Sequence, residues 1–168
     1  MTTPYTNIAE ADAYFEERLY SNLWTNTIAS EKEKALKQAA NIIDRLRYVG
    51  VKHSVYVVAL TGVADDTDLQ AAYLDQEHEF PRNADTEVPE DVKKASFEIA
   101  FALLDGVDME QELRSLSTVS QGYASVRNTY DRMQHTLEHF AAGIPSGIAW
   151  RYLKRFLADP GDVKISRV

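Results

Sequence analysis

Histidines and adjacent acid pairs are the residues of this chain whose types best suit catalysis or metal binding. His135 and His139 are four positions apart and would share one face of a helix. No HExxH pattern accompanies them, so we interpret them as a solvated pair. The acid pairs at 65–66 and 90–91 could bind a hard cation, but acids are also expected beside turns and at helix starts. We therefore predict no metal site.

Other catalytic patterns are missing from the sequence. The chain has no cysteine, which excludes thiol nucleophiles, disulfides and cysteine-ligated zinc, and fits a reducing compartment. Its seven glycines are dispersed, and none belongs to a GxGxxG or GxxxxGK[ST] phosphate loop. No serine belongs to a His–Asp pattern that sequence can reveal. We predict neither catalytic residues nor a cofactor.

One group of residues near the end of the sequence suits binding. Arg151, Lys154 and Arg155 fall on the outward face of an expected helix, with Trp150 and Tyr152 beside them. Cations mixed with aromatic rings are typical of single-strand binders, in which stacking contributes roughly 1–3 kcal/mol per base. Helical spacing assigns the same rings to packing equally well, so both interpretations stay open.

Charge is distributed unevenly along the chain. The formal net charge is −8; residues 1–146 contain 13 Lys or Arg against 24 Asp or Glu, and residues 147–168 contain 5 against 2. An acidic body disfavours general duplex binding, because phosphate neutralisation supplies most non-specific affinity. The longest apolar runs are too short for a bilayer, and the first residues do not resemble a signal peptide. We expect a soluble intracellular protein with no membrane partner.

Helical periodicity predicts the elements that must position these residues. A capping box that starts at Asn7 predicts a helix over 7–20. A second one at Ser30 predicts a helix over 31–48, which Gly50 ends. The region between this helix and the next has a weak pattern, with a β-branched run, a turn and a short helix near its end. An excursion of this length is either a contact element or flexible surface.

The densest local signals lie between residues 80 and 104. Phe80, Pro81 and Arg82 form an expected core anchor, in which the phenyl ring is buried and the guanidinium pairs with a nearby acid. Pro89 then starts a helix over 89–104. Apolar residues on two faces of this helix indicate that it is buried on more than one side. We interpret it as the central core helix.

Over residues 123–130 the sequence periodicity changes from that of a helix to that of a strand. A lone strand cannot satisfy its own backbone, so it must pair either with the run at 55–60 or with a neighbouring subunit. The residues we expect at such a contact between subunits are Tyr123, Val126, Arg127 and Tyr130.

A last helix over 146–157 should direct Ile148, Tyr152, Leu153 and Phe156 inward, and it stops before Pro160. The tail that follows is too short to fold alone. It is either a frayed terminus or a peptide that adds to the sheet edge or groove of a partner. Its candidate binding residues are Asp162, Val163, Lys164, Ile165, Ser166, Arg167 and Val168.

These elements predict a mainly α fold. We expect a bundle of about four to five helices over residues 1–158, with a minor β-strand or hairpin element. An extended C-terminal arm over 159–168 completes the organisation.

The order of five segments resembles the head–tail connector (adaptor) proteins of tailed bacteriophages. The segments are YxxxxxADAYFEERL, EKALKQAANIIDRLRYVG, EFPR with VPEDVKKASFEIAFALL, SQGYASVRNTY, and IPSGIAWRYLKRFL, which together cover nearly the whole chain. The same group is similar to proteins described as DnaT-like single-strand-binding proteins. A single-stranded-DNA-binding replication protein is therefore the alternative.

The resemblance implies a structural virion protein of the phage neck, assembled in the host cytoplasm. Such subunits form a ring of about twelve copies beneath the portal protein, extend the DNA channel and receive the stopper or tail-completion protein. The genome passes through the lumen without sequence-specific binding. In these adaptors the C-terminal segment reaches into the portal, which corresponds here to residues 159–168. An acidic lumen would repel phosphate and let DNA slide.

Overall fold

The computed structural model describes residues 3–111, 120–123, 126–129 and 138–158, and these residues are mainly helical, as predicted. The α-helices are α1 (Ile8–Glu16), α2 (Asn22–Asn26), α3 (Ala29–Asp44), α4 (His53–Ala59), α5 (Asp66–Asp75), α6 (Glu90–Leu104), α8 (Glu138–Ala141) and α9 (Gly147–Leu153). A 3-10 turn, η1 (Lys154–Phe156), follows α9, and the strands are β1 (Ser120–Tyr123) and β2 (Val126–Thr129).

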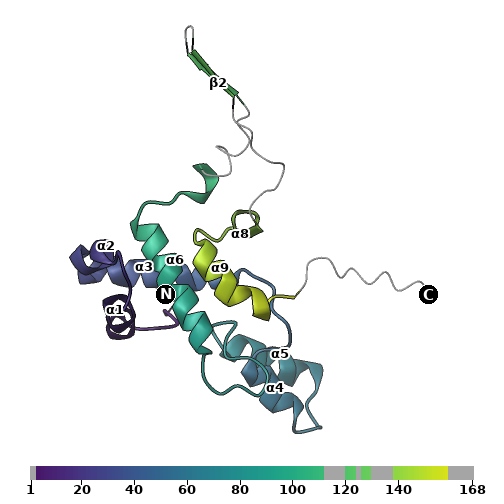
Figure 1. The fold of residues 1–168 in the computed structure, drawn as a ribbon. Helices are drawn as coiled ribbons and strands as arrows, with labels where there is room; N and C mark the ends of the chain where they lie inside the picture. Colours follow the sequence, from purple (N-terminus) through teal and green to yellow (C-terminus); the bar gives the residue numbers. More distant parts are fainter. Residues whose placement is uncertain (1–2, 112–119, 124–125, 130–137, 159–168) are drawn as a thin grey trace.

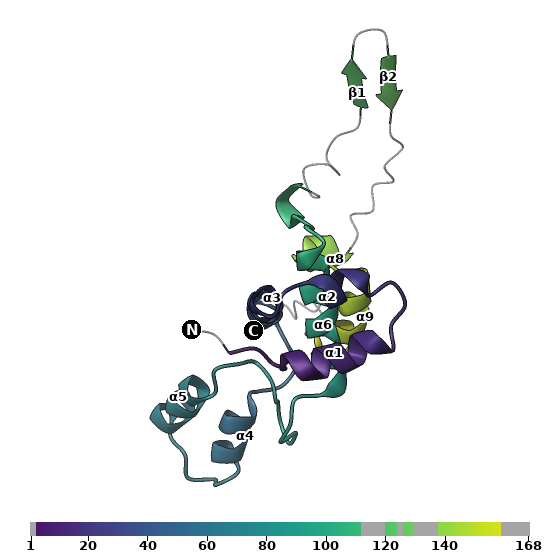
Figure 2. The same cartoon turned by 90° about the vertical axis from the view of Figure 1, so that its left-hand side faces the viewer.

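Helix α6 is the centre of the body, between α3 and α9 (Figure 2). Its residues Val92, Ala95 and Ile99 are fully buried, and Phe97 on a second face is buried as well, which confirms burial on more than one side. Helix α3 contributes a seam that includes Leu36, and α9 contributes Ala149 and Leu153. Because an apolar helix must cover its faces against other elements, α6 fixes where α3 and α9 lie.

Helices α1 and α2 cover the α3–α6 body at one end (Figure 1). The capping box of Asn7 is present, as predicted. The ring of Phe15 stacks on Trp24 with 4.7 Å between centroids. The carboxylate of Asp12 accepts hydrogen bonds from Trp24 Nε1 at 2.7 Å and from Lys32 Nζ at 2.9 Å, so the indole N–H is satisfied although the ring is buried.

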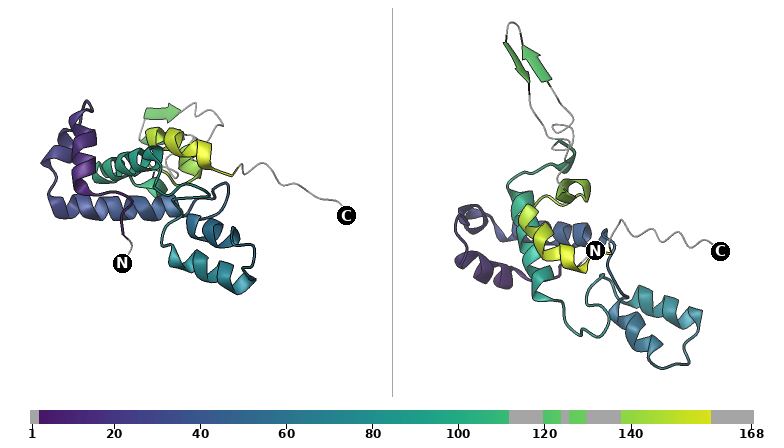
Figure 3. Two further views of the ribbon diagram at one scale, coloured as in Figure 1. Left: turned by 90° about the horizontal axis from the view of Figure 1, so that it is seen from below. Right: turned by 45° about the vertical axis from the view of Figure 1, so that its right-hand side comes forward.

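The helical pair, which we define as α4, α5 and their loop over residues 53–75, projects away from the body (Figures 1 and 3). Within it only Ala72 is buried. The β-branched run at 55–60, one of two predicted strand partners, is mostly helix α4, so that partner is wrong. The short helix expected near the end of this region is present as α5, which has a capping box at Asp65.

Strands β1 and β2 pair antiparallel as a hairpin, which extends far from the helices (Figure 2). In their register Tyr123 lies opposite Val126, and Ser120 opposite Thr129. The predicted single strand over 123–130 is therefore wrong, because these residues straddle the end of one strand and the start of the next. Pairing with a neighbouring subunit stays a prediction, and Tyr130 lies outside the described residues.

Helix α9 begins where Ser146 Oγ accepts a hydrogen bond from Ala149 N at 3.2 Å. Ala149 and Leu153 then occupy the inward stripe, so Ile148 is 45% exposed and its predicted inward position is wrong. The segment after η1 returns to the loop that follows α3, where Ala158 N donates to Arg47 O at 3.0 Å. No helix among the described residues is long and apolar enough to cross a bilayer.

Candidate functional site

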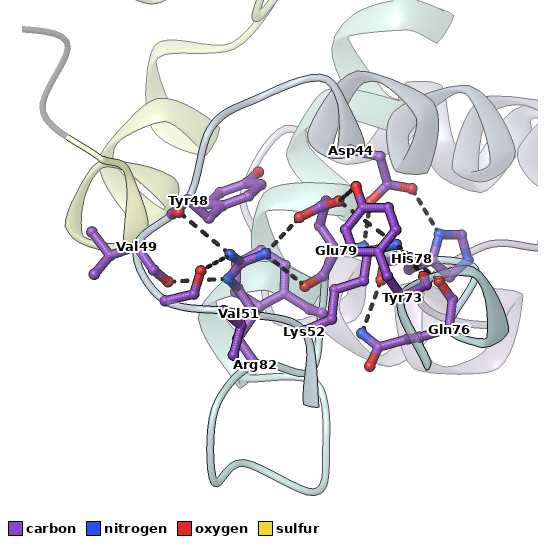
Figure 4. A network of polar contacts seen from close by, with 12 residues as sticks. Asp44, Tyr48, Val49, Val51, Lys52, Tyr73, Gln76, His78, Glu79 and Arg82 are labelled. Atoms are coloured by element: carbon purple, nitrogen blue, oxygen red, sulfur yellow. Dashed lines mark hydrogen bonds and ion pairs between the residues drawn. The ribbon is translucent and has the colours of Figure 1, made fainter. Parts of the chain in front are cut away.

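The buried guanidinium of Arg82 is the centre of a polar network beside the core (Figure 4). Its Nε donates to Val49 O at 3.1 Å, Nη1 donates to Glu79 O and Oε2, and Nη2 donates to Tyr48 O and Gly50 O. These five bonds use all five N–H donors of an arginine. The predicted ion pair with an acid is confirmed. With no donor left for a ligand, Arg82 is a scaffold residue.

Phe80 and Pro81, the other members of the predicted core anchor, support this scaffold role. Phe80 is buried, and its ring packs edge-on against Tyr48 at 4.6 Å and Phe156 at 5.4 Å. The Phe80–Pro81 peptide bond is cis, and Pro81 O accepts a hydrogen bond from His53 N at 3.0 Å.

Lys52 is a second buried cation in this network, and the sequence did not single it out. Its Nζ donates to Gln76 O at 2.9 Å, lies 3.7 Å from Glu79 Oε1 and lies 4.1 Å from the ring centroid of Tyr73. The Glu79 carboxylate is therefore shared between Lys52 and Arg82. A buried amine requires such partners because desolvation without them is costly.

Asp44 joins the end of α3 to the chain around Glu79. Its Oδ1 accepts from Glu79 N at 3.0 Å and from the hydroxyl of Tyr5, while Oδ2 lies 2.8 Å from His78 Nδ1. Burial raises the pKa of Asp44, but the hydrogen bonds from His78 and Tyr5 outweigh this effect and hold it below its ordinary value. The hydrogen bond with Asp44 raises the pKa of His78 above its ordinary value.

A hydroxyl, an imidazole and a carboxylate meet at this point, as they do in a nucleophilic triad. His78 Nε2 lies 2.9 Å from Thr3 Oγ1, and Nδ1 faces Asp44. The Thr3 hydroxyl, however, donates its single hydrogen to Glu77 Oε2 at 2.8 Å. It therefore accepts from His78, which is the reverse of what a general base must do. The arrangement suits a charged histidine that clamps the N-terminal segment.

The network as a whole attaches the helical pair to the body. The segments by which the chain enters and leaves the pair lie side by side. Lys52 and Arg82 form an isolated antiparallel β-bridge, and Asn83 N donates to Val51 O at 2.9 Å. Within the junction, Ser54 Oγ donates to Ala72 O at 2.7 Å. Polar contacts rather than apolar burial thus position the helical pair.

The basic face predicted on the last helix is exposed, but two of its three cations are paired with acids. Lys154 Nζ lies 2.7 Å from Glu138 Oε2, and Arg155 Nη2 lies 2.9 Å from Asp91 Oδ2. Arg151 makes no ion pair with another described residue. Trp150 is half-buried, and its Nε1 donates to Glu138 at 3.2 Å, so this ring is not presented as an open stacking platform.

A cleft of about 620 Å³ lies between the second half of α6 and the α8–α9 segment, and the sequence did not predict it. Apolar and basic groups line it together, notably Arg18, Phe101, Val107, Ile148, Trp150 and Arg151, with acids at Glu98 and Asp105. Burial lowers the pKa of His139 on its wall, which favours the neutral ring. The lining therefore contains two cationic arginines against its two acids.

Arg18 lines this cleft and is held by an ion pair and a cation–π contact. Its guanidinium lies over the Phe101 ring at 4.5 Å, and Nη2 lies 3.0 Å from Glu98 Oε2. Glu98 also accepts from the Tyr14 hydroxyl at 2.7 Å. Arg18 Nη1 is buried, and no acceptor among the described residues reaches it. This donor is thus unsatisfied within the described part of the chain.

The other predicted contact elements are not described at the level of side chains. Residues 159–168, with the whole predicted arm, lie outside the described residues, and so do the side chains of the β1–β2 hairpin. Within the part of the chain that is described, no three His, Cys, Asp or Glu side chains gather as metal ligands. No family model, curated protein or solved structure matches the chain.

Proposed function

We propose that this chain is a structural protein of the phage neck, whose copies form a ring that joins the portal to the stopper or tail and extends the DNA channel. The observation that carries the proposal is the helical pair. It projects from a well-packed body and exposes Val57, Leu60, Val63, Tyr73 and Leu74. Several large apolar side chains exposed on one projecting element are typical of a site of protein association.

Two further features support a role in assembly. Among the described residues the β1–β2 hairpin, which extends from the body, has only two strands. Isolated two-stranded hairpins are marginal in water, so a neighbouring chain would stabilise it. Two of the three cations beside α9, Lys154 and Arg155, are paired with acids, which reduces the basic character of this surface. This distribution suits a wall that DNA passes without sticking.

The experiment is a pull-down of full-length chain by its portal protein, together with a variant that lacks residues 160–168. We expect the full chain to bind and the shortened chain to lose most of its binding, since the arm adds main-chain hydrogen bonds to the partner. Equal binding of both chains would refute the role of the arm. Failure of the full chain to bind would refute the neck assignment.

The alternative, a single-stranded-DNA-binding replication protein, predicts a different measurement. It requires tight binding of the isolated chain to a labelled single-stranded oligonucleotide, with affinity that falls steeply as salt rises. The half-buried Trp150 and the paired Lys154 and Arg155 lead us to expect weak binding instead. Tight, salt-dependent binding would favour the alternative over the neck role.

A further inference from the structure

The tip of the helical pair, residues 60–66, combines apolar side chains with free negative charge. Leu60 is 68% and Val63 is 87% exposed. Gly62 turns the chain there with a φ of +69°, in open space. Asp65 uses its carboxylate to cap α5, whereas the carboxylate of Asp66 makes no hydrogen bond or ion pair with another described residue. The tip is therefore an apolar knob with an available carboxylate beside it.

Charge excludes a symmetric contact between two such tips. Residues 53–75 contain four aspartates and no lysine or arginine, so two copies of this surface would repel each other. Residues 147–156 contain three Lys or Arg and no acid. Of these cations Arg151 lines the cleft, together with exposed Ile148, and it makes no ion pair with another described residue. Ile148 and Arg151 thus give the cleft an apolar group and an unpaired cation, which suit the apolar side chains and the carboxylate of the tip.

The tip of the helical pair lies far from α8 and α9, with other helices of the body between them (Figure 2). The tip is the far end of the α4–α5 pair, whereas the cleft lies beside α8 and the start of α9. A contact between them must therefore join two different copies. Because each copy has one tip and one cleft, the contact repeats head to tail and closes into a ring if the rotation allows.

We propose that the tip of one copy inserts into the cleft of the next copy. Leu60 and Val63 contact the apolar wall near Ile148, and the carboxylate of Asp66 pairs with Arg151. This inference names the subunit contact of the ring and rests on the proposed function for its closure. Asp105 also lines the cleft and opposes an incoming carboxylate, so Asp105→Asn should strengthen the contact.

Cysteine cross-linking tests the pairing directly, because the natural chain contains no cysteine. A chain with both Val63→Cys and Ile148→Cys should give a ladder of covalent oligomers on mild oxidation. An equal mixture of the two single variants should stop at dimers, and each single variant alone should stay monomeric. Ser30→Cys with Val63→Cys is the control, since Ser30 is exposed on α3, and it should give no ladder.

Three results would overturn the contact: dimers from Val63→Cys alone, oligomers by light scattering without a ladder, or a chain that stays monomeric at every concentration. The second result leaves the ring proposal standing. A ladder from a chain that does not bind portal protein would support the contact and refute the neck assignment. The variants change exposed residues only, and circular dichroism checks that each is folded.

A charge exchange tests the ion pair. Asp66→Arg and Arg151→Asp should each weaken self-association about tenfold, and the double variant should restore most of it. Asp75→Arg is the matched control, because it makes the same change at the other end of α5 and should have little effect. Equal loss from Asp66→Arg and Asp75→Arg, or no rescue in the double variant, would refute the Asp66–Arg151 pair.

Discussion

The body and the helical pair are built by different physical means. In the body, α6 is covered on both sides, and Val92, Ala95 and Ile99 are fully buried. In the helical pair only Ala72 is buried, and polar bonds from Lys52 and Ser54 hold its two helices at the junction. Short helices gain most of their stability from packing. The body is therefore held by apolar packing, whereas the helical pair depends mainly on polar bonds at its junction.

Removal of a large ring from the body should give the largest effect. Phe15→Ala deletes a buried ring that stacks on both Trp24 and Phe101, and it should lower the free energy of unfolding by about 3–5 kcal/mol. Leu60→Ala is the control in the helical pair, where the side chain is exposed, and it should stay within about 0.5 kcal/mol. Urea unfolding of the isolated chain measures both. Similar losses of unfolding free energy from the two variants would show that the body and the helical pair do not differ in how they are stabilised.

Loss of the buried amine at the junction should give an intermediate and local effect. Lys52→Met leaves Gln76 O without its donor, which should cost about 1–3 kcal/mol. Hydrogen exchange should show faster exchange in α4 and α5 while α6 stays protected. Lys34→Met, on the exposed face of α3, should leave both regions unchanged. Equal loss of protection in α6 would show that the helical pair and the body form one cooperative unit.

The smallest expected effect is a pH dependence at the clamp formed by His78, Asp44, Glu77 and Thr3. The pKa of His78 is raised from 6.5, so its contribution is complete below that value and is lost as pH rises through the higher folded pKa. The pKa of Asp44 is lowered from 3.8, so its contribution is present above that value and is lost as pH falls through the lower folded pKa.

Urea unfolding from mildly acidic to mildly alkaline pH should therefore show a decline in stability that His78→Asn removes. Coinciding pH profiles of the wild-type chain and the variant would show that the clamp contributes nothing. The N-terminal segment should loosen together with this decline, since Thr3 accepts its hydrogen bond from the charged ring.

Local chemistry predicted some of these elements well. The capping box at Asn7 and the start of α6 after Pro89 were both readable, because a cap depends on residues only a few positions apart. The cap at Ser30 was wrong: Ile28 is the extended residue before α3, so Ser30 is already inside the helix. Sequence spacing identified a helix start here but placed it two residues too late.

Long-range contacts decided what the sequence could not predict. Helix α3 ends at Asp44 rather than at residue 48, because the following segment pairs with the chain after α9, where Val49 N donates to Phe156 O at 2.9 Å. The residues of the network were also missed, since Asp44 and His78 meet across 34 positions. The cleft has the same origin, because it joins Arg18 to residues near 150. Local sequence periodicity does not predict contacts between residues so far apart in the chain.

The junction at Gly50 and Asn83 has a consequence for how this protein can change. A Cβ atom at Gly50 would lie 2.2 Å from Asn83 Oδ1, so the two residues interlock where the chain enters and leaves the helical pair. Entry and exit at one point make residues 53–75 an insertion whose replacement need not disturb the body. Selection can therefore exchange this module for another one. The sequence of residues 53–75 can change in this way while the scaffold that carries it stays constant.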